Sequence, residues 1–276
     1  MAKDKICLFG IDPQVDFCDQ DIGRLAVPGA NEDMVRVGNM IKKYGKDIDE
    51  IQMTMDSHYL LHVAHSRCWV DKNGKHPKPL FLHDGNNVPT PITLDMVKAG
   101  EWRAFNSAWQ GRYEAYLEAL EKGGRYALMI WPDHCIIGHP GQCLYGPFLE
   151  AVTEWENKYF AMAQRTTKGS NPFTEHYSAV KADVEDPKDP KTRLNAKLID
   201  LLKEYDIILG VGEALSHCFA NTMRDIFNEF SADQIKKFVL LEDACSSVPG
   251  CEQMGQDFID EYVAKGMQVA TTTTFF

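Results

Sequence analysis

The sequence predicts an α/β fold built on an open, mostly parallel six-stranded sheet with helices on both faces. Short apolar runs alternate with amphipathic stretches along most of the chain, a pattern typical of parallel strands joined by crossover helices. Two of these runs stop at a carboxylate, as a buried strand does where it meets solvent. Because 276 residues with 44% hydrophobic content can bury one large core, we expect a single domain over residues 1–276.

The first elements along the chain are a strand, a helix and a second strand. The run 6–11 predicts the first strand and ends at Asp12. Residues 31–43 have apolar side chains at helical spacing, and the next run, 51–55, ends at Asp56. Strands are predicted further on at 126–131, 159–166, 207–212, 238–241 and 267–270. The helices expected between and beside them cover 144–158, 194–205, 216–230 and 254–265.

An irregular insertion is expected at about 59–124. Pro77, Pro79, Pro89 and Pro91 and the sequence HDGNN interrupt the pattern there. Only 115–122 is clearly helical within this segment. The insertion could cover the site or form an interface, so a homo-oligomer stays open.

Charge and composition exclude several classes of partner. The net charge of −11 and the pI near 5.3 argue against nucleic acid and anionic membranes, and the pairs Lys42-Lys43 and Lys236-Lys237 are isolated. The apolar stretch near the N-terminus is too short for a signal peptide or a membrane span. Eight scattered cysteines without a CxxC pair indicate reduced thiols. We therefore expect a cytoplasmic protein that acts on a small molecule.

A carboxylate and two histidines predict a metal site. Asp56 and His58 are separated by one residue where a strand ends, and His134 follows Trp131 and Pro132. One carboxylate and two imidazoles suit a divalent transition metal with open coordination positions. Zinc is favoured, and the same ligands also accept iron or manganese.

Cys218 is the candidate nucleophile, although most single cysteines in a chain are buried packing residues. It follows the run 207–212 at a strand-to-helix turn, where helix N–H groups lower a thiol pKa and can bind an oxyanion. The GxGxxL sequence at this turn lacks the third glycine of a dinucleotide-binding motif. Lys168 is a further candidate, with an ordinary surface lysine as the alternative.

Taken in order, these motifs resemble the isochorismatase-like cysteine hydrolases, and among them the nicotinamidases. The WPxHC sequence favours nicotinamidases over metal-free relatives. The blocks that carry the resemblance are Asp12-Pro-Gln-Val-Asp16-Phe17, Asp56-Ser-His58, Trp131-Pro-Asp-His134-Cys135, Lys168-Gly169 and Gly212-Glu-Ala-Leu-Ser-His217-Cys218-Phe-Ala-Asn-Thr222. Two features depart from the family pattern, namely the length of the insertion and Glu213, which occupies a position usually held by a small or apolar residue.

The resemblance implies a role for each matched residue. Cys218 would be the nucleophile that forms a thioester, Asp12 the proton shuttle and Lys168 the third catalytic residue. The backbone N–H groups of Ala214 and Cys218 would form the oxyanion hole, next to a cis peptide bond at Glu213-Ala214. The metal would be held by Asp56, His58 and His134.

The implied reaction is hydrolysis of nicotinamide to nicotinate and ammonia. The pyridine nitrogen would lie on the metal or its water, and the ring would lie against Phe17 and Trp131, with Tyr177 as a looser candidate. His62 is interpreted as a surface or structural histidine. The alternative is that it binds the metal as a further ligand or supports one of the ligands. Two alternatives stay open: another small amide, carbamoyl compound or enol ether as substrate, or a catalytically silent module that binds a metal or a partner protein.

Overall fold

The computed structural model describes residues 3–79 and 90–276. At its centre lies a six-stranded sheet in the order β10-β9-β8-β1-β2-β7, and all of its strand pairs are parallel. The predicted open parallel sheet is therefore confirmed. Its strands are β1 (Ile6–Ile11), β2 (Glu50–Asp56), β7 (Gln164–Lys168), β8 (Ile207–Gly212), β9 (Phe238–Leu241) and β10 (Gln268–Ala270).

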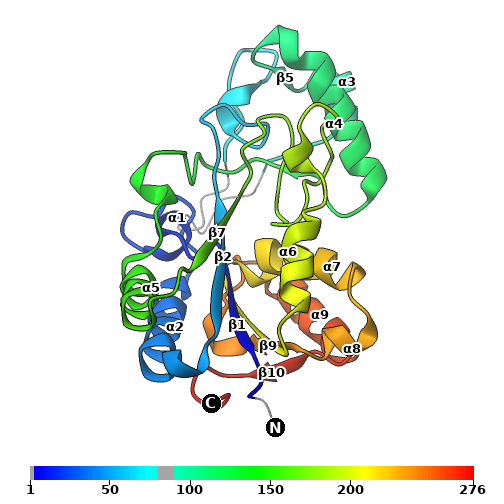
Figure 1. The fold of residues 1–276 in the computed structure, drawn as a ribbon. Coiled ribbons are helices and arrows are strands. Elements are labelled where there is room, and N and C mark those ends of the chain that lie inside the picture. Colours follow the sequence, from blue (N-terminus) through cyan, green and yellow to red (C-terminus); the bar gives the residue numbers. More distant parts are fainter. Residues whose placement is uncertain (1–2, 80–89) are drawn as a thin grey trace.

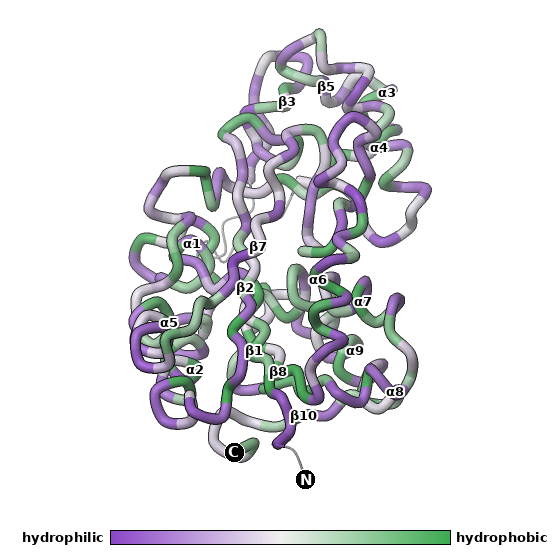
Figure 2. Tube along the Cα trace, viewed as in Figure 1, coloured by the Kyte–Doolittle hydropathy of each residue, from purple (hydrophilic) through white to green (hydrophobic). Residues whose placement is uncertain are grey.

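Helices cover both faces of this sheet (Figure 1). One face carries α1 (Val15–Cys18), α2 (Ala30–Tyr44) and α5 (Gly146–Tyr159). The other carries α6 (Ala196–Lys203), α7 (Ala220–Asn228), α8 (Ala232–Ile235) and α9 (Glu252–Val263). Apolar residues gather along β1 and β8 in the middle of the molecule (Figure 2), where every residue of β1 is buried. Burial of these strands from both sides is the main source of stability for such a sheet.

The region predicted as an irregular insertion lies beyond the carboxyl end of β2 (Figure 1) and is more regular than expected. It contains α3 (Leu94–Lys98) and α4 (Gln110–Gly123). Two small antiparallel sheets accompany them, formed by β3 (Trp69–Val70) with β5 (Arg103–Ala104) and by β4 (Pro91–Ile92) with β6 (Leu128–Met129). Residues 80–89, which include the HDGNN sequence and Pro89, lie outside the described residues.

Two predicted strands are wrong in place or extent. The run 126–131 does not enter the main sheet, because its only strand, β6, pairs with β4 and its apolar side chains pack beside the 59–124 region. The run 159–166 begins too early, because α5 continues to Tyr159 and ends at Phe160, whose φ of 51° is left-handed. The edge strand β7 therefore starts only at Gln164.

Short helical turns complete the fold. They are η1 (Gly45–Asp47), η2 (Ser66–Cys68), η3 (Ser107–Trp109), η4 (Pro140–Gln142), η5 (Pro190–Thr192), the π-helical turn η6 (Leu215–Phe219) and η7 (Glu242–Ala244). Among residues 3–79 and 90–276, no helix is both long enough and apolar enough to cross a lipid bilayer.

Strand order determines which functional residues meet. In the order β8-β1-β2-β7 the four strands end side by side, and each is followed or ended by a polar candidate residue. Asp56 and Lys168 are direct partners in the register of β2 and β7. Ile11, just before Asp12, pairs with Gly212, six residues before Cys218. The candidate residues therefore converge at the carboxyl edge of the sheet, where open α/β folds bind ligands.

Candidate active site

Lys168 lies at the centre of a buried cluster of charged groups. Its ammonium Nζ is 2.9 Å from Asp12 Oδ2 and 3.1 Å from Asp56 Oδ1. The same Nζ is 3.6 Å from the Cys218 Sγ. All four side chains are buried. A surface lysine, the alternative considered for Lys168, is therefore excluded.

Neighbouring groups fix the cluster in place. The Thr54 hydroxyl donates to Asp12 Oδ1 at 2.6 Å and accepts from the Asp12 backbone N–H at 3.0 Å. The Lys168 ammonium donates to the His176 carbonyl at 3.0 Å. The Gly169 N–H donates to His176 Nδ1 at 3.2 Å, and burial lowers the pKa of His176 to about 3, which keeps this nitrogen free to accept.

The cluster controls where protons reside. Burial raises the pKa of Cys218 well above its ordinary value; Lys168 opposes this shift, and Asp12 and Asp56 add to it. Burial also raises the pKa of Asp12, again against the effect of Lys168. Burial alone would lower the pKa of Lys168, but Asp12 and Asp56 outweigh it and hold the ammonium charged. Asp12 and Cys218 are therefore two buried acids that favour their protonated forms and lie beside a charged ammonium.

Cys218 lies in the π-helical turn η6, directly after β8. π-helical turns are rare and often occur at functional sites. The peptide bond between Glu213 and Ala214 is cis, as predicted. The Ala214 N–H donates none of the backbone hydrogen bonds found in the described part of the chain, and Ala214 and Cys218 line the same pocket. This N–H is thus available to a ligand at the thiol.

Asp56, His58 and His134 offer ligand atoms that all lie within 4.8 Å of one another. His58 Nδ1 donates to the Gly169 carbonyl at 3.0 Å, and His134 Nδ1 donates to the Pro132 carbonyl at 2.8 Å. Both Nε2 atoms then face Asp56 Oδ2, at 2.9 Å and 3.4 Å. Backbone acceptors on Nδ1 are the usual way to orient a metal-binding imidazole, so the three side chains fit a divalent metal.

An aromatic pocket adjoins both the thiol and the metal-binding residues. Phe17, Trp131 and Tyr177, the three residues predicted to contact the substrate ring, line it together with Cys218 and His134. Trp131 Nε1 donates to the Tyr177 hydroxyl at 2.8 Å, which fixes the two walls relative to each other. The pocket is therefore mostly apolar, and both the Cys218 thiol and the side chains of Asp56 and His134 face it.

Sequence reasoning left several residues near this pocket without a role. His62 is buried, and its two nitrogens contact the backbone of Thr174 and Ala64, so it is a structural histidine rather than a surface one. Ligand atoms of His58, His62 and Glu175 also lie within 4.8 Å of one another, but the backbone already occupies the nitrogens of His62.

His65, Glu175 and His217 were also missed as neighbours of the site. His65 is fully buried, with its ring 5.4 Å from His58 and 5.7 Å from that of His134. Glu175 and His217 line the aromatic pocket. His217 lies in the Cys218 motif, which gave it no role of its own, and no motif marks His65 or Glu175, because their position depends on how distant loops pack.

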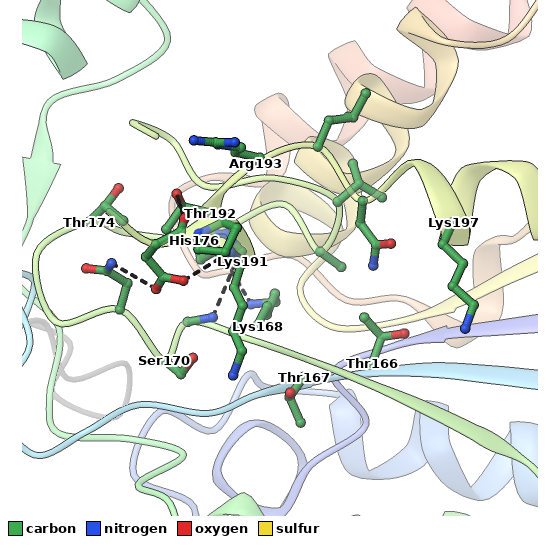
Figure 3. Close-up of a pocket in the computed structure, with 18 of the residues that line it drawn as sticks. Thr166, Thr167, Lys168, Ser170, Thr174, His176, Lys191, Thr192, Arg193 and Lys197 are labelled. Atoms are coloured by element: carbon green, nitrogen blue, oxygen red, sulfur yellow. Dashed lines mark hydrogen bonds between the residues drawn. The ribbon is translucent and has the colours of Figure 1, made fainter. Parts of the chain in front are cut away.

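A second, polar groove of about 610 Å³ lies on the free side of β7 (Figure 3). Lys168 and His176 border it from the active-site side, and the exposed cations Lys191, Arg193 and Lys197 lie around it.

Comparison with known proteins identifies the fold. No protein-family model matches the sequence, and no curated protein matches it. The structure of the yeast nicotinamidase bound to the inhibitor nicotinaldehyde matches 96% of this chain and 99% of its own, at 17% identity and a TM-score of 0.62.

Two further solved structures support the same assignment. PnC1 from L. infantum in complex with nicotinate covers 99% of this chain and 96% of its own, at 17% identity and a TM-score of 0.58. The pyrazinamidase of Pyrococcus horikoshii in complex with zinc covers 97% of this chain and 99% of its own, at 17% identity and a TM-score of 0.54. The chain therefore has the isochorismatase-like α/β fold that its motifs predicted. Within that class, its fold is the one found in nicotinamidases and pyrazinamidases.

Proposed function

We propose that the protein is a metal-dependent nicotinamidase that hydrolyses nicotinamide to nicotinate and ammonia through a thioester on Cys218. The observation that carries the proposal is the buried contact of Lys168 Nζ with both Asp12, at 2.9 Å, and Cys218, at 3.6 Å. Cys218 lines the same aromatic pocket as Asp56 and His134. The fold shared with nicotinamidases agrees with it.

Asp12 and Lys168 prepare the thiol for attack. Asp12 and the Cys218 thiol both lie against the Lys168 ammonium, so the carboxylate can take the thiol proton as the sulfur attacks the amide carbon. The Lys168 ammonium stabilises the negative charge on the sulfur and the carboxylate. The new C–S bond converts the carbonyl oxygen into an oxyanion, which the N–H groups of Ala214 and Cys218 stabilise.

The same proton then completes the cycle. Asp12 delivers it to the amide nitrogen as the C–N bond breaks, and ammonia departs to leave a thioester on Cys218. A water molecule attacks the thioester and gives a proton to Asp12, which returns it to the sulfur when the C–S bond breaks. The acid is released, and the cluster regains its initial state.

The metal-binding residues position the substrate in this scheme. Asp56, His58 and His134 would hold a divalent metal, with zinc favoured over iron or manganese, and the bound metal would supply an anchor that orients the pyridine ring. The ring lies between Phe17 and Trp131, with Tyr177 behind it. All eight cysteines are free thiols, which supports a cytoplasmic location for the enzyme.

The proposal is tested by ammonia release from nicotinamide with purified, zinc-loaded protein. We expect Cys218→Ala to abolish turnover, and we expect His58→Ala to lower kcat/KM by at least about 10²-fold together with the zinc content, because ligand orientation is lost. Cys143→Ala and His139→Ala, which change exposed residues, are matched controls and should behave as wild type.

The outcomes separate the alternative functions. An active wild type with inactive Cys218→Ala supports the nicotinamidase. Zinc-loaded protein that releases no ammonia from nicotinamide but hydrolyses another small amide or a carbamoyl compound identifies a related hydrolase. Turnover that survives in Cys218→Ala contradicts the thioester, and a chain inactive on the whole amide panel is a catalytically silent module.

A further inference from the structure

Glu213 is a fully buried carboxyl group that the reaction scheme does not use. It lies between the end of β8 and the turn η6 that carries Cys218, directly before the oxyanion-hole residue Ala214. Among the described residues it forms no salt bridge. A buried carboxyl without a cation must find other partners or lose its charge.

The partners of Glu213 are a backbone N–H and a second carboxyl. Oε2 accepts from the Ser246 N–H at 3.1 Å. The other oxygen, Oε1, has no donor, while the Glu213 carboxyl is within hydrogen-bonding reach of Asp33. Two carboxylates cannot bond to each other, but one proton between them converts Glu213 into a donor and satisfies both groups.

The charges around the pair place this proton on Glu213. Arg36 on α2 forms a salt bridge with Asp33 Oδ1, and the Ser246 hydroxyl donates to Asp33 Oδ2 at 2.6 Å, so both Asp33 oxygens already face donors. Burial, and then the charge of Asp33, raises the pKa of Glu213 well above its ordinary value.

Two other titratable groups face Glu213. They are the thiols of Cys18 on α1 and Cys245 after β9. Burial raises the pKa of both thiols well above the ordinary value, so neither adds a negative charge beside Glu213 at neutral pH.

Glu213 and Ser246 together hold the backbone on both sides of Ala214. The Glu213 N–H donates to the Ile11 carbonyl at 2.8 Å, which ties the segment to the residue before Asp12. The Leu215 N–H donates to the Ser246 carbonyl at 2.8 Å. The Ser246 N–H thus donates to the Glu213 side chain, and the Ser246 carbonyl accepts from Leu215. The loop at Ser246 therefore holds the backbone on both sides of Ala214.

We propose that Glu213 is a positioning residue of the oxyanion hole, whose neutral carboxylic acid bridges Asp33 and Ser246 and thereby aims the Ala214 N–H at the reacting carbonyl. The inference rests on the proposed amidase reaction. It gives a physical role to the polar residue that departs from the family pattern. Loss of the proton places a second anion against Asp33 and releases the bridge, so activity falls at alkaline pH for a reason separate from Cys218.

The test is a pair of variants, Glu213→Gln and Glu213→Ala, with steady-state kinetics on nicotinamide from pH 6 to 10. Gln keeps the shape and a permanent donor, so we expect kcat within about threefold of wild type at pH 7 and a smaller alkaline decline. Ala removes the bridge, so we expect kcat to fall by about 10- to 100-fold with KM changed less than threefold, since the hole stabilises the transition state.

A control and a spectroscopic measurement complete the design. Glu118→Gln, on an exposed face of α4, should match wild type throughout. Isotope-edited infrared spectra should show a protonated carboxyl band in wild type at pH 7 that Glu213→Gln lacks. Equal alkylation of Cys218 by iodoacetamide in wild type and Glu213→Ala shows that the kinetic loss is not unfolding.

The two proposals fail in different ways. An active wild type whose kcat is unchanged in Glu213→Ala, or whose Glu213 is ionised at pH 7, overturns the positioning role and leaves the nicotinamidase intact. A wild type that hydrolyses no amide but shows the protonated band overturns the enzyme proposal alone. Glu213→Gln that is as slow as Glu213→Ala at every pH also contradicts the role, because the neutral bridge should rescue it.

Discussion

Two clusters of buried carboxyl groups lie near the turn that carries Cys218. They differ in what compensates the cost of burying a carboxylate charge. Asp12 and Asp56 share the Lys168 ammonium, at 2.9 Å and 3.1 Å. Among the described residues Glu213 forms no salt bridge; burial and the charge of Asp33 raise its pKa, and in our proposal the two carboxyls share one proton. Both clusters are shielded from water, so burial alone does not decide whether a carboxyl is charged; the nearest partner does.

The difference matches what each cluster is proposed to do. A charged cluster beside a thiol can take up and return a proton during each turnover. A neutral acid that bonds to a loop backbone holds a fixed geometry and has no proton to exchange at neutral pH. Substitutions that remove the partner of one carboxyl group at a time test this difference between the two clusters.

Removal of the cation should have the largest effect. Lys168→Met leaves Asp12 and Asp56 buried without their common partner, so we expect the free energy of unfolding of the metal-free protein to fall by about 3 to 5 kcal/mol. Ammonia release should fall to the background level. Urea denaturation measures the free energy of unfolding, and the amidase assay measures ammonia release. Lys197→Met, at an exposed lysine in the groove of Figure 3, is the control and should change stability by less than about 0.5 kcal/mol.

An unchanged urea midpoint for Lys168→Met would show that the ammonium does not stabilise the two carboxylates. The charged cluster would then resemble the neutral one more closely than the distances indicate.

Removal of one hydrogen-bond partner from the charged cluster should have an intermediate effect. Thr54→Val keeps the shape but leaves the Asp12 N–H and Oδ1 without the hydroxyl, at a cost of about 1 to 3 kcal/mol in stability. We expect kcat to fall by about tenfold, because Asp12 is less well oriented to the thiol. Thr167→Val, on the exposed side of β7, is the matched control. Equal kcat in both variants would mean that Lys168 alone orients Asp12.

Substitution in the neutral cluster should have the smallest effect on stability and the clearest pH dependence. Because the pKa of Glu213 is raised in the folded state, its contribution to stability is complete below the ordinary Glu range and is lost as pH rises towards the raised value. Glu213→Gln does not titrate. We therefore expect the free energy of unfolding of Glu213→Gln to increase relative to that of wild type as pH rises, by about 1 kcal/mol at pH 8.

Thermal or urea unfolding of wild type and Glu213→Gln at pH 5 and pH 8 measures this difference. A stability difference that is the same at both pH values would place an ionised Glu213 in the folded protein and remove the contrast between the clusters.

Sequence patterns predicted the strands of the central sheet well and the elements around the sheet less well. Runs such as 6–11 and 207–212 are apolar throughout and end at polar residues, so their strands were predicted with the right bounds. The run 126–131 is equally apolar, yet it packs beside the 59–124 region and forms only β6. Apolar character predicts burial, whereas the choice of partner strand depends on contacts far along the chain.

The same division holds for the candidate site. Asp12, Asp56, His134 and Cys218 could each be selected from the sequence, because local motifs at strand ends mark them. Lys168 was selected through the resemblance, with a surface lysine as the alternative, and its pairing opposite Asp56 is what places its ammonium inside the cluster. Short-range chemistry is therefore readable from neighbouring residues, while the electrostatic surroundings of a buried group depend on packing.

By itself, the sequence determined the α/β class, the strand-end positions of the chemical groups and the type of chemistry they can perform. The tertiary structure decided which groups share a proton and which share a cation. Asp33 and Glu213 are 180 positions apart, and Asp12 and Lys168 are 156 apart. Their interactions arise because strand order and helix packing bring distant side chains together out of water, where the partner determines the charge of each carboxyl.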